Sequence, residues 1–347
     1  MQPDYSRQTL LKEIGAQGQA VLARSRVLVV GAGGLGSPVI QYLAGAGVGC
    51  LGLVDNDTLD ASNLHRQPIF TLADTGKNKA ELALMAVKKI NPTVHVESHT
   101  TRLDANNALA LVEAYDAVVD CSDNFRTKYL LNDAAVLARK PTIFASVYQY
   151  EGQLQVYKPE PGYACLRCVW PDATVDGIEG NCAESGVLGP VPGTVGSLQS
   201  LLTLKILLGL SGQLEGELWL LDFTNFSTLK IKAPRRGECH APLCAHIRGI
   251  VPEDFHIEIA LQSLHEAAAR GLEVIDIRTL DEFTTHPTTG RHIAMPDLLC
   301  NPDLLPHGQQ FLLVCASGKR SLATARELRR RGLSARSLTG GLQSLKD

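Results

Sequence analysis

A glycine-rich turn between a short apolar run and a helix-prone segment constrains the fold of this chain more than any other feature. Residues 26–30 read R-V-L-V-V, and Gly31, Gly33 and Gly36 follow in the spacing G-x-G-x-x-G. A buried strand that ends in such a turn, with a helix starting near Pro38, is typical of a nucleotide-binding βαβ unit. The backbone can approach phosphates closely there. The motif alone is equally compatible with an NAD-dependent oxidoreductase.

Later segments continue the alternation of strands and helices. Cys50–Val54 and Ala117–Asp120 are apolar runs that predict buried parallel strands. Residues 77–90 predict a helix. This alternation predicts an α/β fold with a Rossmann-like, doubly wound sheet. Over residues 148–157 polar and apolar residues alternate, which predicts an antiparallel part of the same sheet.

The pattern resets near residue 250, and a second unit follows. The chain has 347 residues, which is long enough for two or three domains. We predict a first domain over residues 1–247, a linker over 248–257 and a small α/β domain over 258–347. Apolar runs at 272–277 and 311–315 predict strands of this last domain.

Composition argues against several classes of function. Hydrophobic residues make up 45% of the chain and charged residues 20%, as in ordinary soluble domains. The net charge of −3 gives no basis for direct binding of nucleic acid or of an anionic membrane. The longest apolar helical segment, residues 197–210, is shorter than the roughly 20 residues that a membrane span needs. Nine cysteines without a disulfide framework favour a reducing compartment, so we predict a cytoplasmic protein.

Polar side chains gather after the glycine loop in a pattern that suits a triphosphate better than a dinucleotide. Asp55 lies about 20 residues beyond the loop, where an acid that binds ribose is expected. Arg66 and Lys79 would neutralise charge that builds on a leaving polyphosphate. Asp120 and Asp123 end a later strand, and a carboxylate there can hold Mg²⁺. An oxidoreductase has no use for this combination.

Several ordered motifs carry a resemblance to a known family. They are Y-S-R-Q (5–8), G-A-G-G-L-G-S (31–37), V-D-N-D (54–57), S-N-L-H-R-Q (62–67), G-K-N-K (76–79), D-C-S-D-N (120–124), C-L-R-C (165–168) and G-V-L-G-P-V-P-G-T-V-G-S-L-Q (186–199). Over residues 4–245 the chain resembles the ubiquitin-activating-enzyme superfamily, in its MoeB/ThiF branch. The resemblance implies ATP-dependent adenylation of the C-terminal glycine of a small ubiquitin-like sulfur carrier protein, with release of pyrophosphate. A glycine carboxylate is already ionised at pH 7, so this reaction needs positioning and charge neutralisation rather than a general base.

The resemblance also implies roles for individual residues. Arg66 and Lys79 neutralise the phosphates, and Asp123 holds Mg²⁺. Arg7 matches an arginine that the family extends across a dimer interface into the ATP site of a second copy, which implies a homodimer. The residues expected to bind ATP and Mg²⁺ are Gly31, Gly33, Gly34, Gly36, Asp55, Asp57, Ser62, Asn63, Arg66, Gln67, Lys79, Asp123 and Asn124.

Two pairs of cysteines predict a structural zinc site. One pair is C-x-x-C, and the second has four residues between its members. Four thiolates in two pairs suit tetrahedral Zn²⁺, whereas a lone C-x-x-C is also compatible with a redox pair. The family usually spaces the second pair as C-x-x-C too, so the replacement of one thiol by His240 or His246 stays open. The expected ligands are Cys165, Cys168, Cys239 and Cys244.

Another cysteine, Cys182, lies in a glycine-bearing stretch without periodicity, residues 171–186. This stretch predicts a mobile loop, which would let the thiol swing toward an acyl-adenylate. By resemblance, Cys182 forms a covalent sulfur link with the activated carrier or with a sulfur donor. The alternative is an incidental exposed cysteine.

The end of the chain, residues 258–347, resembles a rhodanese domain. Cys315 ends an apolar run and opens the loop C-A-S-G-K-R, and a helix is expected over 321–331. Successive backbone N–H groups, the helix dipole and two cations would stabilise a thiolate there. The segments V-I-D-I-R (274–278) and T-G-G (339–341) match the rhodanese pattern, and an arginine five residues after Cys315 fits a sulfurtransferase. An ordinary core cysteine at a strand end is the alternative.

These expectations combine into one function. The first domain would adenylate a carrier that ends in Gly-Gly, and Cys315 would deliver sulfur from a donor such as a cysteine desulfurase or thiosulfate, giving a carrier thiocarboxylate. A MoaD-type carrier, and with it molybdenum cofactor biosynthesis, is favoured. A ThiS-type carrier for thiamine synthesis, or thiolation of tRNA or of a secondary metabolite, stays open. A non-catalytic scaffold that binds a ubiquitin-like protein is the alternative from another class.

Overall fold

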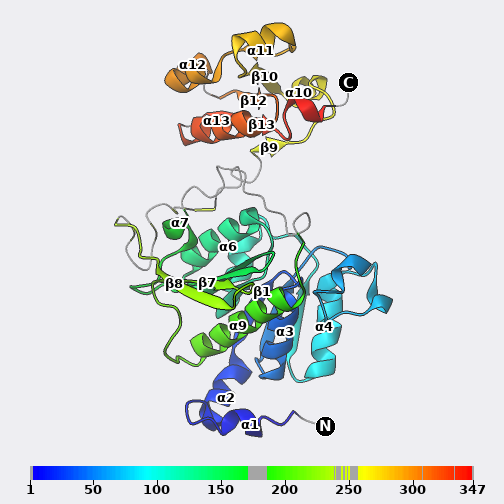
Figure 1. The fold of residues 1–347 in the computed structure, drawn as a ribbon, viewed down its shortest axis with the longest axis vertical. Coiled ribbons are helices and arrows are strands. Elements are labelled where there is room, and N and C mark those ends of the chain that lie inside the picture. The colour runs from blue at the N-terminus through cyan, green and yellow to red at the C-terminus, as the bar shows by residue number, and fades with distance from the viewer. Residues whose placement is uncertain are drawn as a thin grey trace. The chain divides into compact units, whose positions relative to one another are not determined.

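The chain forms two compact units, residues 1–250 and 251–347, each built around its own sheet (Figure 1). The boundary between the units falls inside the segment 248–257. The computed structural model describes residues 3–170, 186–237, 239, 244, 247, 249–250, 257–306, 308–331 and 333–345.

The first unit is built on an eight-stranded mixed sheet. Its strands are β1 (Arg26–Val30), β2 (Cys50–Val54), β3 (His95–His99), β4 (Ala117–Asp120), β5 (Thr142–Tyr148), β6 (Glu151–Tyr157), β7 (Glu217–Asp222) and β8 (Ser227–Lys232). They lie in the order β3-β2-β1-β4-β5-β6-β7-β8. Neighbours from β3 to β5 pair in parallel, and β6, β7 and β8 pair antiparallel. The predicted Rossmann-like sheet with an antiparallel part is confirmed.

Helices pack against this sheet in two groups. They are α1 (Ser6–Thr9), α2 (Gly15–Arg24), α3 (Gly36–Gly45), α4 (Lys79–Ile90), α5 (Ala108–Glu113), α6 (Phe125–Ala138), α7 (Leu166–Val169) and α9 (Pro190–Leu207), with 3₁₀ turns at Ala61–Asn63 and Leu72–Asp74. α9, α3 and α4 lie side by side (Figure 1), and α5 packs on α6. Right-handed crossovers in opposite directions from β1 place these two groups on opposite faces, which makes the sheet doubly wound.

Two asparagines determine where the helices that carry polar site residues begin. The side-chain oxygen of Asn78 accepts hydrogen bonds from the backbone N–H groups of Ala80 and Glu81, at 2.9 and 3.2 Å. The side-chain oxygen of Asn124 accepts from Thr127 N–H at 2.8 Å. Such caps satisfy N–H groups that the first helical turn leaves free. The caps therefore start α4 and α6 just after turns at the edge of the sheet.

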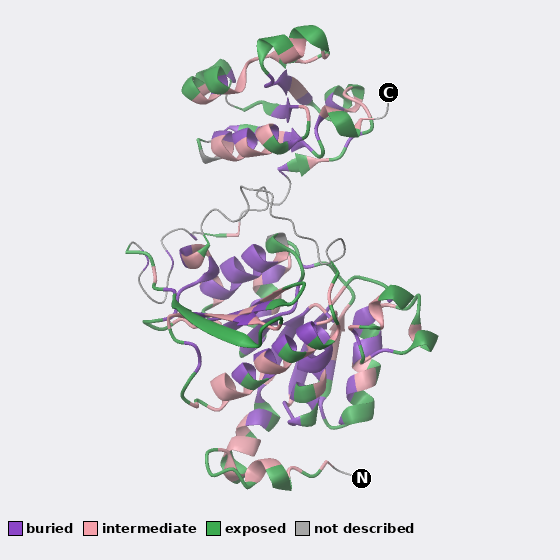
Figure 2. Cartoon of the chain, in the orientation of Figure 1, coloured by how far each residue is buried: buried purple, intermediate pink, exposed green. Residues whose placement is uncertain are grey.

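Burial follows the order of the strands. Every residue of β2 is buried, and β1 and β4 are buried almost throughout, as expected for parallel strands covered on both faces. Figure 2 contrasts these strands with β8, the antiparallel edge strand, in which every residue is exposed. The antiparallel end of the sheet therefore presents an open surface, while the parallel part forms the core.

The second unit has a five-stranded sheet in which all neighbours pair in parallel. Its strands are β9 (Glu258–Ile259), β10 (Leu272–Asp276), β11 (Arg291–His292), β12 (Gln310–Val314) and β13 (Ser334–Leu338), and its helices are α10 (His265–Ala269), α11 (Leu280–Thr285), α12 (Met295–Cys300) and α13 (Lys319–Arg330), with 3₁₀ turns at Pro302–Leu304 and Leu342–Ser344. The strand order is β11-β10-β12-β13-β9. Both strands predicted here, at 272–277 and 311–315, are present within one residue of the expected ends.

Element boundaries differ from expectation where turn chemistry decides them. The antiparallel pairing expected over residues 148–157 is present, but it involves a strand that begins earlier: β5 ends at Tyr148, Gln149 turns the chain in a left-handed conformation (φ 50°), and β6 returns along β5. The helix predicted over 321–331 begins two residues earlier, after Gly318. No helix among the described residues is long and apolar enough to cross a membrane.

Candidate functional site

A cavity of about 1020 Å³ opens along one edge of the first unit's sheet. Val30, Val54 and Cys121 mark the ends of the parallel strands β1, β2 and β4 on its wall. Ligands of open α/β sheets bind outside the carboxyl ends of the strands, where the strand order reverses. In this sheet the order reverses between β1 and β4, so the cavity lies where a nucleotide is expected.

The glycine loop is shaped by steric limits at two positions. Gly31 has φ 99°, and a Cβ atom there would lie 2.6 Å from the carbonyl oxygen of Cys121. A Cβ on Gly36 would lie 2.1 Å from the carbonyl oxygen of Gly31. Glycine is therefore required for the turn and for the close packing of α3 on β1. Gly33 and Gly34 line the cavity, whereas Gly36 supports the loop from behind.

Asp55 connects the end of β2 to the glycine loop. One carboxylate oxygen accepts a hydrogen bond from the backbone N–H of Ala32 and the other from that of Asp57, both at 2.8 Å. Burial raises the pKa of Asp55, and these two N–H groups partly offset that effect. Asp55 lines the cavity. A carboxylate has further lone pairs, so it can hold the loop and still accept a ribose hydroxyl.

Lys79 and Asp57 form an ion pair on the cavity wall. The distance from Lys79 Nζ to the Asp57 carboxylate is 3.2 Å, and the Lys79 side chain is 8% exposed while that of Asp57 is 63% exposed. Asn78 holds this corner by donating from its side chain to the carbonyl groups of Asp55 and Asp57. A mostly buried ammonium whose ion-pair partner faces solvent can exchange that partner for a phosphate.

Gln67 and Arg66 bring unsatisfied polar groups to the same wall. Gln67 is 3% exposed, and its side-chain Oε1 has no hydrogen-bond partner. Arg66 contacts the carbonyl of Ser62 at 3.2 Å and His65 at 2.8 Å, and it has no acidic partner within the described part of the chain. A buried amide without a partner costs free energy, so this corner is suited to a ligand that supplies hydrogen bonds and negative charge.

The two acids that follow β4 have different environments. Asp120 is fully buried and pairs with Lys128 Nζ at 2.7 Å, and it also accepts from Ser122 Oγ. Asp120 does not line the cavity, and its charge is balanced by Lys128, so of the two acids it is the less suited to Mg²⁺. Asp123 is exposed on the cavity wall and accepts only a 3.3 Å hydrogen bond from Asn124, among the residues described. Its carboxylate fits a hard cation such as Mg²⁺.

Most of the predicted nucleotide residues meet at this cavity. Those that line it are Gly31, Gly33, Gly34, Asp55, Asp57, Asn63, Arg66, Gln67, Lys79, Asp123 and Asn124. Ser62 does not line it: its N–H donates to Asp60, and its carbonyl supports Arg66. Cys182 lies outside the described residues.

Arg7 lies far from this chain's own cavity. It is an exposed residue of α1, which is anchored through Tyr5. The Tyr5 hydroxyl accepts a hydrogen bond from Asn91 at 2.7 Å, and its ring lies against Gly47. Asn91 and Gly47 follow the C-terminal ends of α4 and α3, whereas the N-terminal ends of these helices reach the cavity. Helices of this length separate their ends by about 15 Å, so Arg7 can act only in a cavity other than its own.

The cavity also has walls that the sequence did not predict. Lys128 lies at its base, and Thr101 and Arg102 extend it beyond β3. The antiparallel hairpins contribute further residues, among them Tyr148, Gln153, Leu220, Asp222 and Leu229. The rule that ligands meet the carboxyl ends of strands could have indicated residues 101–102 once β3 was recognised. The sequence contains no comparable signal for the hairpin residues.

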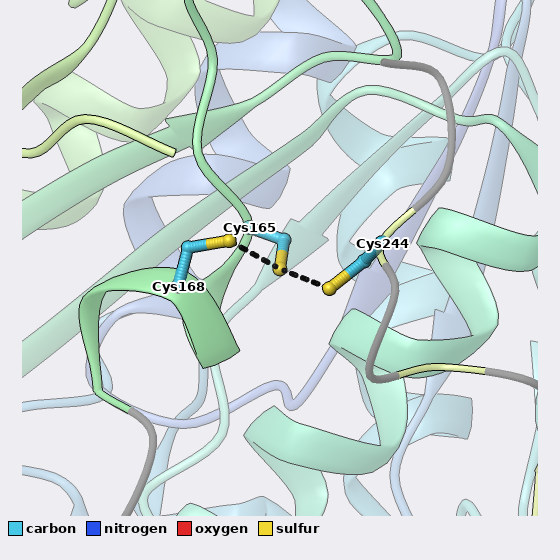
Figure 3. A group of neighbouring side chains, drawn as sticks. All are labelled: Cys165, Cys168 and Cys244. Carbon is cyan, nitrogen blue, oxygen red and sulfur yellow. Dashed lines mark hydrogen bonds between the residues drawn. The ribbon is translucent and has the colours of Figure 1, made fainter. Parts of the chain in front are cut away.

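The four predicted cysteines come together between α7 and the end of the first unit. Figure 3 shows the sulfur atoms of Cys165, Cys168 and Cys244 pointing toward one another, at 3.7 Å for Cys165–Cys168 and 3.6 Å for Cys165–Cys244. Cys239 lies 3.2 Å from Cys244, and all four residues are buried. Zn–S bonds of about 2.3 Å would place tetrahedral sulfurs about 3.8 Å apart, which the distances among Cys165, Cys168 and Cys244 fit. Cys239 is closer to Cys244 than this geometry requires, and it is not part of the group of three sulfurs that lie within 4.8 Å of one another. His240 and His246 lie outside the described residues.

This cysteine cluster is attached to α6. Leu166 N–H donates to Asn132 Oδ1 at 2.7 Å, and Arg167 forms two 2.7 Å bonds with Asp133. Hydrogen bonds from Cys165 and Cys244 lower the pKa of the Cys168 thiol. The reciprocal contacts raise the pKa of the Cys165 and Cys244 thiols.

In the second unit, Cys315 lies at the start of the loop between β12 and α13. It is fully buried, and its sulfur contacts the hydroxyl and the backbone N–H of Ser321, both at 3.4 Å. The N–H of Leu342 donates to the Cys315 carbonyl at 2.9 Å, so the turn at 339–341 packs on the loop. The backbone N–H groups of Ala316, Ser317 and Gly318 make no hydrogen bond within the described part of the chain. These three N–H groups are free for an anion, as the expected nest requires.

The two arginines near Cys315 are ion-paired, although the sequence suggested unpaired cations there. Arg320 forms two hydrogen bonds with the carboxylate of Glu282, at 2.6 and 2.8 Å. The pKa of Glu282 is lowered to about 2, chiefly by Arg320. Arg278 is likewise paired with Asp276 at 2.7 Å, in a buried contact. Of the two loop cations, only the exposed Lys319 has no acidic partner in the described part of the unit.

Known proteins are similar in sequence to both units of the chain. The sequence model of the ThiF family matches residues 5–241. "Adenylyltransferase and sulfurtransferase MOCS3" of Anopheles gambiae is 38% identical over 378 aligned positions, which cover 98% of this chain and 85% of that protein. The "Sulfur carrier protein adenylyltransferase" of Thermus thermophilus is 45% identical over 244 positions, which cover 69% of this chain and 89% of that protein.

Solved structures show the same fold for the first part of the chain. The E. coli MccB crystal structure superposes with a TM-score of 0.60 at 25% identity, covering 71% of this chain and 72% of that one. A crystal structure of E. coli MccB with ATP also gives a TM-score of 0.60, at 22% identity, covering 70% and 74%. The expectation of a MoeB/ThiF-type enzyme is confirmed at the level of the family: the chain belongs to the ThiF family.

Proposed function

We propose that this protein uses ATP to adenylate the C-terminal glycine of a small ubiquitin-like sulfur carrier, and that it then transfers sulfur to the activated carrier from Cys315. One observation carries the first half. A single cavity combines a glycine loop, the cations Arg66 and Lys79 and the unpaired carboxylate of Asp123. The names of the relatives support adenylation of a sulfur carrier.

Different residues of the cavity would have different roles in adenylation. A carboxylate oxygen of the carrier attacks the α-phosphorus of ATP, and the bond to the bridging oxygen breaks as pyrophosphate leaves. Arg66 and Lys79 stabilise the charge that develops on pyrophosphate, and Lys79 would exchange Asp57 for phosphate oxygens. Asn63 and Gln67 orient the nucleotide, with Gln67 Oε1 as a free acceptor. When bound at Asp123, Mg²⁺ would supply charge neutralisation.

The open end of the cavity suits the carrier. The hairpins between β5 and β8 line this end with apolar side chains and with polar ones that include the acids Glu151 and Asp222. Tyr148, Tyr150 and Phe226 of these hairpins are exposed. Exposed apolar groups beside a cavity are typical of a protein-binding surface. A flexible C-terminal tail could enter here and place its carboxylate near the glycine loop.

Sulfur transfer would follow activation. A persulfide on Cys315 attacks the carrier's acyl carbon, and AMP leaves with the electron pair of the broken C–O bond. The resulting acyl disulfide releases the carrier thiocarboxylate when a second thiolate, for which we propose Cys182, attacks the sulfur of Cys315. The alignment over 98% of the chain with a protein named as an adenylyltransferase and a sulfurtransferase supports a rhodanese-like second domain.

Zinc and the dimer complete the proposal. The four cysteines would hold structural Zn²⁺, and a homodimer would bring Arg7 to the cavity of a second copy. Elemental analysis should find about one zinc per chain, and Cys165→Ser should lose it while Cys300→Ser, at an exposed cysteine, should keep it. Equal zinc in both variants would refute the site. A cytoplasmic location stays a prediction.

ATP–pyrophosphate exchange tests the adenylation step. Two purified carriers should be compared, one of MoaD type and one of ThiS type, each with and without its terminal glycine. We expect exchange that depends on the terminal glycine of one carrier, with the MoaD type favoured. Exchange with the ThiS type only would move the function to thiamine synthesis. Binding of a carrier with no exchange would favour a non-catalytic scaffold.

A further inference from the structure

The ion pair between Glu282 and Arg320 bears on which sulfur donor the second unit can use. Arg320 is the second residue of α13 and follows the Cys315 loop directly. Its guanidinium forms hydrogen bonds with both carboxylate oxygens of Glu282, at 2.6 and 2.8 Å. Its pKa is raised mainly by Glu282, with a smaller contribution from the neighbouring Cys315 thiol. Arg320 is therefore paired with Glu282 at the end of the loop that Cys315 opens.

Glu282 is held in place by its own helix. It is the third residue of α11, where it forms a capping box with Thr279: Thr279 N–H donates to Glu282 at 3.0 Å, and Glu282 N–H donates to the Thr279 hydroxyl at 3.4 Å. A capping box restricts the side-chain conformation of its glutamate. A two-bond contact with arginine is also specific in geometry. The carboxylate thus neutralises Arg320 in a defined position rather than by transient surface contact.

The charge of the donor decides whether this neutralisation matters. With thiosulfate, the Cys315 thiolate attacks the outer sulfur, the S–S bond breaks, and sulfite leaves with the electron pair. With a persulfide, the same attack on the terminal sulfur releases a thiolate. Thiosulfate brings two negative charges to the loop, whereas a persulfide of an uncharged thiol brings one. A free guanidinium beside the nest of backbone N–H groups therefore favours a dianion more than a monoanion.

We propose that Glu282 is a specificity-determining residue, which favours persulfide donors over thiosulfate by keeping Arg320 neutralised beside Cys315. The inference rests on the proposed sulfur transfer by Cys315. Lys319 does not replace Arg320, because it is exposed and its charge is screened by solvent. Asp276 and Arg278 form a separate buried pair, so Arg278 supplies no free charge either.

The test compares Glu282→Gln with Asp281→Asn in the full-length protein. Glutamine keeps the capping box but leaves Arg320 charged and unpaired. Asp281 is an exposed acid on the same helix, and the carboxylate that pairs with Arg320 belongs to Glu282. The donors are thiosulfate and 2-hydroxyethyl persulfide, with cyanide as acceptor. We expect Glu282→Gln to raise kcat/KM for thiosulfate about tenfold, through KM, the equivalent of about 1.4 kcal/mol. Persulfide transfer should change less than twofold, and Asp281→Asn should change neither.

A second readout does not depend on turnover. Sulfate, an inert dianion, should protect Cys315 from alkylation at lower concentration in Glu282→Gln than in the wild type. If the variant changes neither thiosulfate transfer nor sulfate protection, or changes both donors equally, the specificity role is wrong and the ion pair only joins α11 to α13. If Cys315→Ser transfers sulfur as well as the wild type, the sulfurtransferase function fails, and this inference fails with it.

Discussion

The ATP-type cavity of the first unit and the cysteine loop of the second unit differ in how far their polar and charged groups are already paired. In the cavity, Gln67 Oε1 has no partner, Asp123 lacks a cation, and Lys79 is paired with an acid that faces solvent. In the loop, Cys315 is fully buried and Arg320 is already neutralised by Glu282. Unsatisfied groups can bind a ligand directly, whereas a buried sulfur atom must first become accessible. The cavity of the first unit can thus bind its ligand as it stands, whereas the loop of the second unit must open locally before a donor can reach the Cys315 sulfur.

The largest expected effect is on the free energy of unfolding, and it concerns the ion pair between Lys128 and Asp120. Lys128 lines the cavity, but it pairs with the fully buried Asp120. Lys128→Met should cost about 3–5 kcal/mol of unfolding free energy, because it leaves a buried carboxylate without its partner. Urea denaturation measures this. The double variant Asp120→Asn/Lys128→Met should recover more than half of the loss. A loss below about 1 kcal/mol for the single variant would mean that the pair is not structural.

The next prediction concerns the rate of ATP–pyrophosphate exchange rather than stability. Lys79→Ala should lower carrier-dependent ATP–pyrophosphate exchange by about 10²–10³-fold, because a preorganised cation at the leaving group is lost. Lys77→Ala provides the matched control, since Lys77 is exposed and pairs only with Asp74 at 3.5 Å. Its exchange rate should stay within about twofold of the wild type, a difference of under about 0.5 kcal/mol. Equal losses in both variants would contradict the role of Lys79.

A smaller effect tests whether the loop of the second unit is closed. Cys300 and Cys315 belong to the same unit, but only Cys300 is exposed. Iodoacetamide should therefore label Cys300 at least about tenfold faster than Cys315, which corresponds to an opening free energy of about 1.4 kcal/mol or more. Peptide mapping by mass spectrometry distinguishes the two sites. Faster labelling of Cys315 would show that the loop is open in solution.

The smallest effect is a pH dependence. The pKa of Glu282 is lowered to about 2 from its usual value of 4.5, so the Arg320 contact stabilises the folded state above about pH 4.5 and loses this contribution as the pH falls toward 2. Because both side chains are about one-third exposed, the contribution should be under about 1 kcal/mol. The difference in unfolding free energy between wild type and Glu282→Gln should shrink between pH 6 and pH 3. A difference that grows on acidification would have the wrong sign.

The sequence predicted the parallel part of the fold and most of the cavity because both depend on local signals. The turn at Gly31 and the acid at Asp55 each leave a pattern within a few residues. The motifs also predicted that the two cysteine pairs form one cluster, although nearly 80 residues separate Cys165 from Cys244.

The rest depends on contacts between distant residues, which a sequence pattern does not record. Asp120 and Asp123 look alike in the motif D-C-S-D-N, yet Lys128 occupies only the first. In the same way, the loop C-A-S-G-K-R suggests two free cations, but Glu282, 38 residues away, neutralises one of them. Pairing decides which charges remain available to a ligand, and pairing is a property of the folded chain.

The central claim is that the two units act in sequence on one carrier. Mass spectrometry of the carrier after incubation with ATP, a persulfide donor and the protein tests it most directly, with wild type, Arg66→Ala and Cys315→Ser compared. The account predicts thiocarboxylate with the wild type, unmodified carrier with Arg66→Ala, and adenylated but not thiolated carrier with Cys315→Ser. Thiocarboxylate formed by Cys315→Ser at the wild-type rate would contradict it.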